Sequence, residues 1–399
     1  MQKNFDLIIV GCGLAGASLA VALRDAPLAL LLVESLPPAH GSVPPVAADA
    51  WDARVYAISP ANSAFLAEIG VWPHLAGERM NRVRFMEVWE RERGHMTFTA
   101  PDAELPELAW ILEASLMMNE LREHLKRQAN VTFFSPARPT AFCADSQDAD
   151  GLATLTLQDE QTLCARLIVG ADGQNSWTRQ QAGLAALDTP YNAKAVVANF
   201  MCEKPHHDTA WQWFREDGIL AWLPLPGERL SMVWSAEDAK AEALLALSPD
   251  ELAETVAAAG GNILGRLTTL TPAMAFPLHS IRVPATVAPR LALIGDAAHG
   301  IHPLTGHGIN LGFQDAKALA TLLRQAVPGQ DIGALAFLQR YQRVRREEIV
   351  VLQHATDFLA HCFTARLPGL SALRALGLDL THRLPALKKL LARYAAGML

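Results

Sequence analysis

The sequence predicts an α/β fold, α+β overall, in which a parallel-sheet domain is interrupted by an antiparallel sheet domain and closed by C-terminal helices. Three observations predict it. A glycine-rich turn near the N-terminus joins a short apolar run to an Ala/Leu-rich helical segment. Alternating, aromatic-rich runs fill the middle of the chain, and helical periodicity follows Gly308. With 399 residues and 51% hydrophobic side chains, the chain is long enough for two linked cores.

The first element is a βαβ unit. Residues Asp6–Val10 form a brief apolar run that predicts a buried strand, and the turn Gly11–Gly16 follows it directly. Ala15–Asp25 have helical spacing, and Leu28–Val33 predict a second buried strand. Two strands joined through a helix require a parallel pairing and a right-handed crossover, so we expect a Rossmann-like domain.

The turn has the spacing of a dinucleotide-binding fingerprint, GxGxxG. Gly11 permits a tight turn, Gly13 lets the backbone approach a pyrophosphate, and Gly16 allows close packing of helix on strand. The intervening Leu14 and Ala15 start the helix, whose N–H groups favour phosphate. Glu34, 18 residues after Gly16, and its neighbour Ser35 are the expected partners of the adenosine ribose. The alternative is a glycine turn that only packs.

The remaining elements follow in chain order. Segments 82–98 and 195–235 alternate apolar and polar residues between Pro, Gly and charged turns, which predicts antiparallel strands. Arg166–Val169 and Leu291–Ile294 return to the parallel layer, and helices are expected at Ile309–Arg324 and from Ile332 to about Phe363. The predicted boundaries are 1–73, 108–182 and 277–330 for the dinucleotide-binding domain, 74–107 and 183–276 for the substrate domain, and 331–399 for the helical region.

Two further motifs narrow the dinucleotide. Asp172-Gly173 follows one strand and leads to Arg179, and Gly295-Asp296 follows another and leads to Pro303-Leu-Thr-Gly306-His-Gly308-Ile309-Asn310. With the first turn, these resemble the motifs of the single-component FAD aromatic hydroxylases, the group of para-hydroxybenzoate hydroxylase. The chain is more narrowly similar to the ubiquinone-biosynthesis hydroxylases. That closer match lies in Asp52–Ser59 with Gly70-Val-Trp72, in Ala210–Leu225, and in the tail from Phe363 to Met398.

The resemblance implies an FAD site. It assigns the ADP half to the glycine turn and Glu34, and hydrogen bonds from the ribitol to Asp296. The flavin pyrimidine edge would meet the backbone N–H groups of a helix start, whose partial positive charge suits it. Asp172 and Arg179 either contact the cofactor or brace their own turn. The implied cofactor-binding residues are Gly11, Gly13, Leu14, Ala15, Gly16, Glu34, Ser35, Arg54, Asp172, Asp296, Pro303, Gly306, Gly308, Ile309 and Asn310.

The implied reaction is hydroxylation of an aromatic ring. NAD(P)H, a transient co-substrate, reduces the flavin, and O₂ then forms a C4a-hydroperoxyflavin that transfers one oxygen atom, most naturally here to a polyprenylated phenol. Pro303 would shape the dioxygen pocket and His302 is the candidate for proton handling. Three alternatives stay open: another aromatic substrate, such as a small phenolic acid or secondary metabolite, a flavin reductase acting on isoprenoid double bonds, and a non-catalytic FAD-binding assembly partner. A long apolar channel favours the lipid, and an Arg-lined pocket favours an acid.

Two departures from the family pattern fall near the expected flavin. His307 stands where these hydroxylases usually carry Gln, and Ala114-Ser115 stand where they carry Asn-Arg after Glu113. His299, His302 and His307 are also close enough in sequence to suggest metal ligands. Pro303 and two glycines break any shared helical face, and no carboxylate has ligand spacing, so no metal is expected.

Charge and composition limit the partners. The formal net charge of -7 gives no basic field for nucleic acid, and the five cysteines have no paired spacing, which favours a reducing cytoplasm. No leader peptide is expected, and the apolar runs are shorter than a bilayer span. Residues 361–399 carry six basic side chains against one acidic. They predict either a closing helix with a solvated face, or a peripheral contact with the inner membrane face or with partner enzymes.

Overall fold

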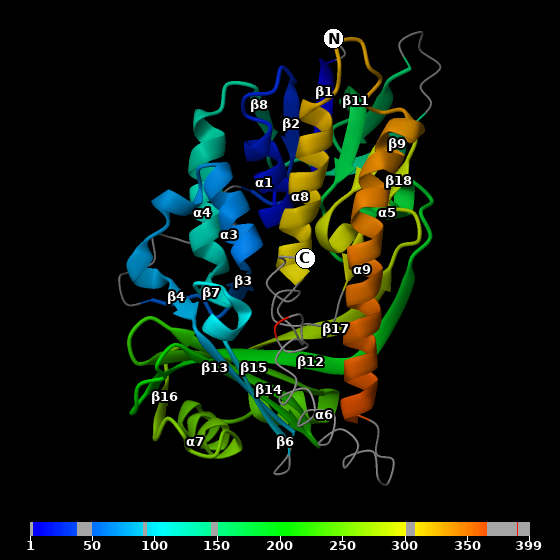
Figure 1. Cartoon of the computed structure of the whole chain (residues 1–399). Helices are drawn as coiled ribbons and strands as arrows, with labels where there is room; N and C mark the ends of the chain where they lie inside the picture. Colours follow the sequence, from blue (N-terminus) through cyan, green and yellow to red (C-terminus); the bar gives the residue numbers. More distant parts are fainter. Residues whose placement is uncertain are drawn as a thin grey trace.

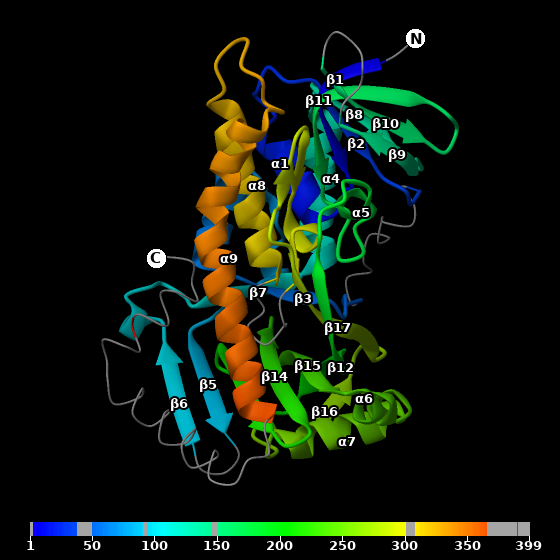
Figure 2. The ribbon, with the colours of Figure 1, turned by 90° about the vertical axis from the view of Figure 1, so that its right-hand side faces the viewer.

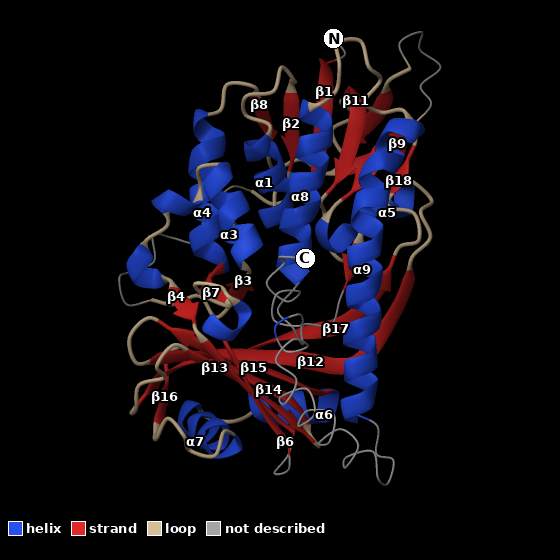
Figure 3. Ribbon diagram, in the orientation of Figure 1, coloured by secondary structure: helices blue, strands red, loops and turns tan. Residues whose placement is uncertain are grey.

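The computed structural model describes residues 3–37, 50–90, 94–144, 151–300 and 308–364, together with Lys389. Within them a parallel sheet with its helices forms the upper half of Figure 1, and a large antiparallel sheet forms the lower half. Figure 3 shows helices gathered on the parallel sheet and strands dominating below it. The predicted α/β fold class with two different sheets is therefore confirmed.

The parallel sheet has eight strands in the described residues, in the order β18-β19-β11-β1-β2-β8, with the ribbon β10-β9 added at β11. β1 pairs in parallel with both β2 and β11, as the βαβ pattern predicts. All four residues of β2 are buried, as expected for a strand covered on both faces. The bounds are β1 Lys3–Val10, β2 Leu30–Val33, β8 Val131–Phe134, β9 Pro139–Cys143, β10 Ala153–Leu157, β11 Thr162–Gly170, β18 Val287–Ala288 and β19 Leu291–Leu293.

The alternation of side chains along β1 divides the core of this domain. Leu7 and Ile9 belong to the cluster formed with the helices. Ile8 and Val10 belong to a second cluster, with residues of the β9–β10 ribbon and α5. The helices of this half are α1 Leu14–Ala22, α3 Pro60–Glu68, α4 Ala114–Arg127, α5 Trp177–Gln181 and α8 Gly308–Arg324.

The antiparallel sheet has nine strands in the described residues, in the order β20-β17-β12-β15-β14-β13-β5-β6, with β16 beside β12. One pairing differs from expectation: β5 runs parallel to β13, because these strands come from distant segments and no hairpin joins them. Its bounds are β5 Phe85–Glu90, β6 Gly94–Thr99, β12 Leu187–Cys202, β13 Thr209–Arg215, β14 Gly218–Leu225, β15 Arg229–Glu237, β16 Leu267–Thr269, β17 Met274–Arg282 and β20 His299–Gly300. β17 runs across the predicted boundary at 276/277.

The two faces of this sheet have different neighbours. Leu220, Trp222 and Trp234 lie on the face covered by α6 (Asp238–Leu245) and α7 (Pro249–Ala259). The opposite face looks toward the parallel-sheet half (Figure 1). Between the halves lies a three-stranded sheet, β3-β7-β4, with bounds β3 Val55–Ile58, β7 Ala109–Glu113 and β4 Asn81–Val83. Single 3-10 turns are Trp72–His74, Gly77–Arg79, Pro101–Ala103 and Gly295–Ala297.

The long helix α9 (Leu335–Thr364) runs beside both halves (Figure 2). Its Tyr341 hydroxyl donates to the carbonyl of Leu293 at 2.9 Å, and its Gln353 amide donates to the carbonyl of Ile281 at 3.1 Å. The helix therefore ties the parallel sheet to the antiparallel one. In the described part of the chain, every helix is too short or too polar to cross a bilayer.

Candidate functional site

The glycine turn is built as its sequence pattern predicts. Gly11 has φ +97°, and a Cβ there would lie 2.5 Å from the carbonyl oxygen of Ala171. A Cβ on Gly16 would lie 2.3 Å from the carbonyl oxygen of Gly11. Around Gly13, by contrast, a Cβ would meet nothing within 4 Å. Two glycines therefore serve packing, and the middle one leaves the backbone open to a ligand at the start of α1.

The acid at the end of β2 faces this turn. Glu34 accepts a hydrogen bond from the backbone N–H of Cys12 at 2.9 Å. Burial, together with the Glu34 carboxylate, raises the pKa of the Cys12 thiol to about 12, so Cys12 stays a neutral packing residue. The Ser35 hydroxyl is exposed beside the same carboxylate. The end of β2 and the glycine turn therefore lie side by side, and the Glu34 carboxylate is held next to the turn.

Three segments far apart in the sequence meet at small residues. A Cβ on Gly295, which has φ +62°, would lie 3.2 Å from the Cβ of Ala15. A Cβ on Gly312 would lie 3.3 Å from the same atom and 3.5 Å from the Cα of Gly295. The starts of α1 and α8 and the Gly-Asp turn therefore pack without intervening side chains.

The Asp-Gly motif supports the other side of this junction. Asp172 accepts hydrogen bonds from the backbone N–H and hydroxyl of Thr178 at 2.8 and 2.9 Å, and from the Ser176 hydroxyl at 2.5 Å. Arg179 donates to the carbonyls of Gln174 and Ala297, both at 2.9 Å. Asp172 therefore braces its own turn, which is one of the two alternatives that the sequence left open. Arg179 also connects this turn to the Gly-Asp turn through Ala297.

Asp296 is the one exposed residue in the segment 291–300. Loss of hydration where the protein surrounds its carboxyl raises the pKa of Asp296, His299 opposes this rise, and Asp315 reinforces it. The same carboxylate also acts on Tyr56 of β3, whose pKa is raised by burial and by Asp296, while Arg54 opposes this rise. β3 therefore brings Tyr56 within electrostatic reach of the Gly-Asp turn, and Arg54, just before β3, lies within reach of Tyr56. Tyr56 was not expected, although it lies in the stretch Asp52–Ser59 that carries the family resemblance.

Asn310 locks the start of α8 to the end of β3. Its side-chain oxygen accepts from the backbone N–H of Ser59 and the amide of Asn62, both at 2.9 Å, and its amide donates to the carbonyl of Ala57 at 2.8 Å. The side chain is thus used internally. The backbone N–H groups of the first turn, at Gly308, Ile309 and Asn310, are the donors that this helix start offers to a ligand.

The departure at Ala114-Ser115 lies beside the segment of Arg54. The backbone N–H of Ala114 donates to the carbonyl of Arg54 at 2.9 Å, and that of Ser115 donates to the Asp52 carboxylate at 3.2 Å. Both side chains are buried. Short residues at this point let the start of α4 pack against the segment before β3.

Glu113, the residue before Ala114, is buried, with 1% of its surface exposed. Burial raises the pKa of its carboxyl against the opposing hydrogen bonds of Asp52 and Arg79. The Arg79 guanidinium donates to both carboxylate oxygens, at 2.7 and 2.8 Å, and lies over the Trp51 ring at 4.2 Å. Arg229 of β15 approaches the same ring at 5.2 Å. The antiparallel sheet is thereby fastened to the segment that carries Arg54.

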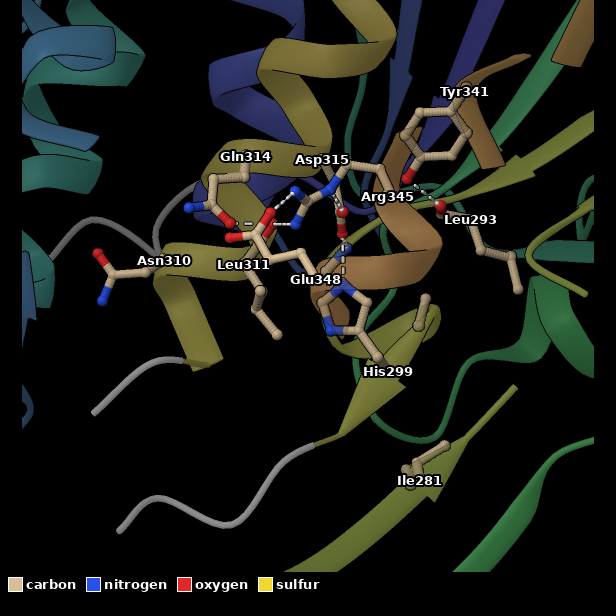
Figure 4. Close-up of polar contacts among 12 residues, drawn as sticks. Ile281, Leu293, His299, Asn310, Leu311, Gln314, Asp315, Tyr341, Arg345 and Glu348 are labelled. Atoms are coloured by element: carbon tan, nitrogen blue, oxygen red, sulfur yellow. Dashed lines mark hydrogen bonds and ion pairs between the residues drawn. The ribbon is translucent and has the colours of Figure 1, made fainter. Parts of the chain in front are cut away.

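A buried charge network lies behind the Gly-Asp turn (Figure 4). Asp315 of α8, fully buried, accepts from the backbone N–H of Gly295 at 2.9 Å, from His299 Nε2 at 2.5 Å and from Arg345 Nε at 2.7 Å. Arg345 of α9 also pairs with Glu348. Sequence patterns missed Asp315 and Arg345; the available signal was an acid on the apolar, core-facing side of an amphipathic helix.

Several expected site residues lie outside the described part of the chain. They are His302, Pro303, Gly306 and His307. Of the three histidines considered as ligands, His299 is described, and it is 1% exposed and bonded to Asp315. Within the described residues no group of three or more His, Cys, Asp or Glu has a metal-binding arrangement.

Comparison with known proteins decides the family. A family model described as FAD binding domain matches residues 4–354. The chain is 34% identical over 394 residues to the 3-demethoxyubiquinol 3-hydroxylase of Escherichia coli strain K12, covering 98% of each chain. It is 33% identical to the ubiquinone hydroxylase UbiL of Rhodospirillum rubrum, covering 100% of this chain and 91% of that one. The chain belongs to the ubiquinone-biosynthesis FAD hydroxylase family.

The fold agrees with this family. The p-nitrophenol 4-monooxygenase PnpA from Pseudomonas putida DLL-E4 superposes with a TM-score of 0.78 at 17% identity, covering 98% of this chain and 97% of that one. The chain described here is, like the members of its family, an FAD-dependent monooxygenase, and FAD is its cofactor. The described residues fit that group: the backbone at Gly13 is open, α1 starts there with no acidic residue in its first turn, and the Asp296 carboxylate is exposed.

Proposed function

We propose that this hydroxylase inserts one oxygen atom into the ring of a polyprenylated phenol in ubiquinone biosynthesis, using O₂ and NAD(P)H. The observation that carries the proposal is the similarity to the 3-demethoxyubiquinol 3-hydroxylase, which runs through 98% of both chains. When bound, FAD supplies the transfer of electrons from NAD(P)H to O₂ and the activation of oxygen. The protein supplies orientation, exclusion of water and fixed charges.

The cofactor contacts that we propose follow the geometry above. The N–H groups of Gly13, Leu14 and Ala15 would face the pyrophosphate. Glu34 and Ser35 would face the adenosine ribose. Asp296 would face the ribitol, and Arg54 would lie beside the flavin. The backbone of the α8 start would face the flavin through Gly308, Ile309 and Asn310. Gly11, Gly16 and Asp172 would support these segments. From the sequence alone, we also propose that Pro303 shapes the dioxygen pocket, that His302 handles protons and that Gly306 binds the cofactor.

The face of the antiparallel sheet that looks toward the cofactor domain suits a lipid-like substrate. Ala221, Leu223 and Val233 are half-buried there, and the register of β14 and β15 puts them on the side away from α6 and α7. Gln212 and Ser231 are neutral polar members of this face. The charged members of this face, Arg229 of β15 and Glu90 of β5, lie at strand ends. The apolar surface between them favours a phenol with a hydrocarbon tail over a small phenolic acid. We therefore assign substrate binding to segments 74–107 and 183–276 and FAD binding to 1–73, 108–182 and 277–330.

The pathway assignment predicts a specific chemical phenotype. Cells that lack this protein should lose ubiquinone and accumulate a precursor one hydroxyl group short, measured by mass spectrometry of the quinone fraction. The purified holoprotein should oxidise NAD(P)H faster when that precursor is added, with matching oxygen uptake. Normal ubiquinone in the deletion strain would remove the pathway assignment. FAD binding without substrate-stimulated oxidation would instead indicate an assembly partner.

We also propose that the basic C-terminal tail brings the enzyme to anionic lipid, so that its substrate enters from the bilayer. Residues 361–399 carry six basic side chains, of which Lys389 is described and pairs with Glu104 at 2.6 Å. Exposed basic residues each contribute about 1 kcal/mol to binding at an anionic surface. Full-length protein should co-sediment with vesicles containing anionic lipid and not with neutral ones.

The matched variants keep the Lys389 pair. The triple change Arg383→Gln, Lys388→Gln and Arg393→Gln should weaken vesicle binding by roughly 100-fold. The control triple, Lys126→Gln, Arg127→Gln and Arg343→Gln, removes the same charge from the surface of α4 and α9 and should bind as wild type. Equal binding by both triples would contradict a role for the tail.

A further inference from the structure

Arg122 lies on α4, seven residues after Ser115, so the two residues are two turns apart on the same side of the helix. α4 packs against α1, and the amide of Gln128 near its end donates to the carbonyl of Ala20 at 2.9 Å. Long side chains on a helix lean toward its N-terminus. The Arg122 side chain is therefore directed back toward the end of α4 where Ser115 lies.

The guanidinium of Arg122 has an unused donor. Its Nη1 atom is buried and has no hydrogen-bond partner within the described part of the chain. The buried Arg179 and Arg345, by comparison, each donate to several protein oxygens. A buried N–H of a cation without an acceptor is costly, so its presence indicates a partner other than the described residues.

The dinucleotide turn lies within electrostatic reach of this donor. Arg122 acts electrostatically on Cys12, opposing the rise that burial and Glu34 cause in its pKa, so the guanidinium lies within reach of the turn. The first turn of α1 begins at Leu14 with neither an acidic residue nor a side-chain cap. Its N–H groups and the Arg122 guanidinium together form a positive environment suited to a diphosphate.

We propose that Arg122 is a cofactor-binding residue whose guanidinium contacts the pyrophosphate of FAD. The inference rests on the FAD site proposed above and deepens it.

The test is titration of the apoprotein with FAD, followed by flavin fluorescence, together with competition by ADP and by adenosine. Arg122→Met should weaken binding of FAD and of ADP by roughly 10- to 100-fold, because charge-assisted hydrogen bonds to phosphate are lost. Adenosine, which has no phosphate, should bind Arg122→Met and wild type equally. Arg122→Lys should recover part of the affinity.

The matched control is Arg127→Gln on the same helix, whose side chain is 73% exposed and lies 3.9 Å from Glu123. It should bind all three compounds as wild type does. ADP binding by Arg122→Met at wild-type strength would overturn the proposal, and so would an equal loss of adenosine, which indicates a packing role. Failure of wild type to bind FAD would instead count against the FAD site as a whole. The melting temperature of each apoprotein shows whether the variants fold.

Discussion

Asp315→Asn should lower the free energy of unfolding by about 3–5 kcal/mol, because it removes a countercharge from the buried Arg345 and the carboxylate that His299 contacts. Asp315 is 0% exposed, so water cannot replace the lost charge. The carboxylate accepts three hydrogen bonds, whereas the NH₂ group of asparagine can only donate, so it would face other donors without an acceptor. Urea unfolding of the apoprotein, followed by tryptophan fluorescence, measures the loss.

The control is Asp331→Asn, because Asp331 also pairs with an arginine, Arg290, but is 46% exposed. Solvent screens such a pair, so this change should cost less than about 1 kcal/mol. Equal losses for the two variants would show that the buried network contributes no more than a surface ion pair.

The contribution of Asp315 has a defined pH dependence. Burial alone would raise the pKa of its carboxyl, but His299 and Arg345 hold it below its usual range. A depressed folded-state pKa stabilises the fold above the unfolded-state pKa of about 3.9, and this stability is lost as pH falls through the folded value. The difference between wild type and Asp315→Asn should therefore be constant near neutrality and shrink below about pH 4.

Gly13→Val should weaken FAD binding by at least about 100-fold, equivalent to about 2.8 kcal/mol, while leaving the apoprotein as stable as wild type. A Cβ at Gly13 meets no protein atom within 4 Å, so the side chain enters only the space that the pyrophosphate needs. Equilibrium dialysis with FAD gives the affinity, and thermal unfolding of the apoprotein gives the stability.

Gly16→Ala is the complementary variant in the same turn. Its Cβ would lie 2.3 Å from the carbonyl oxygen of Gly11, and a backbone atom cannot give way as a flexible side chain does. We expect the apoprotein to lose about 1–3 kcal/mol of stability. If Gly13→Val destabilised the apoprotein as much as Gly16→Ala, the division between a packing glycine and a ligand-facing glycine would be wrong.

Local patterns were sufficient for the parallel half of the fold. The run before Gly11, the turn itself and the Ala-rich helix each have a periodicity that neighbouring residues determine, and β1, α1 and β2 agree with it. α8 and α9 also follow helical spacing closely. The parallel pairing of β5 with β13 had no such signal, because strand partners distant in sequence are chosen by packing.

The site was predictable to the extent that its chemistry lies in short motifs. Gly13, Glu34 and Asp296 stand at strand ends, where the topology brings them together. Asp315 and Arg345 lie in the middle of helices, and only the tertiary structure reveals that both reach the back of the Gly-Asp turn. The role of Arg122 depends on an unused donor, which no sequence pattern records.

The contact between Arg345 and Asp315 bears on how the protein is made. The turn at Gly11 leaves the ribosome before α9, which carries the guanidinium that completes the support of the Gly-Asp turn. Domains generally fold as units, so a domain is complete only when all of its segments have been made. Capture of the cofactor should therefore be a late event in synthesis, and messages truncated before codon 345 should yield chains that are cleared without ever acquiring flavin.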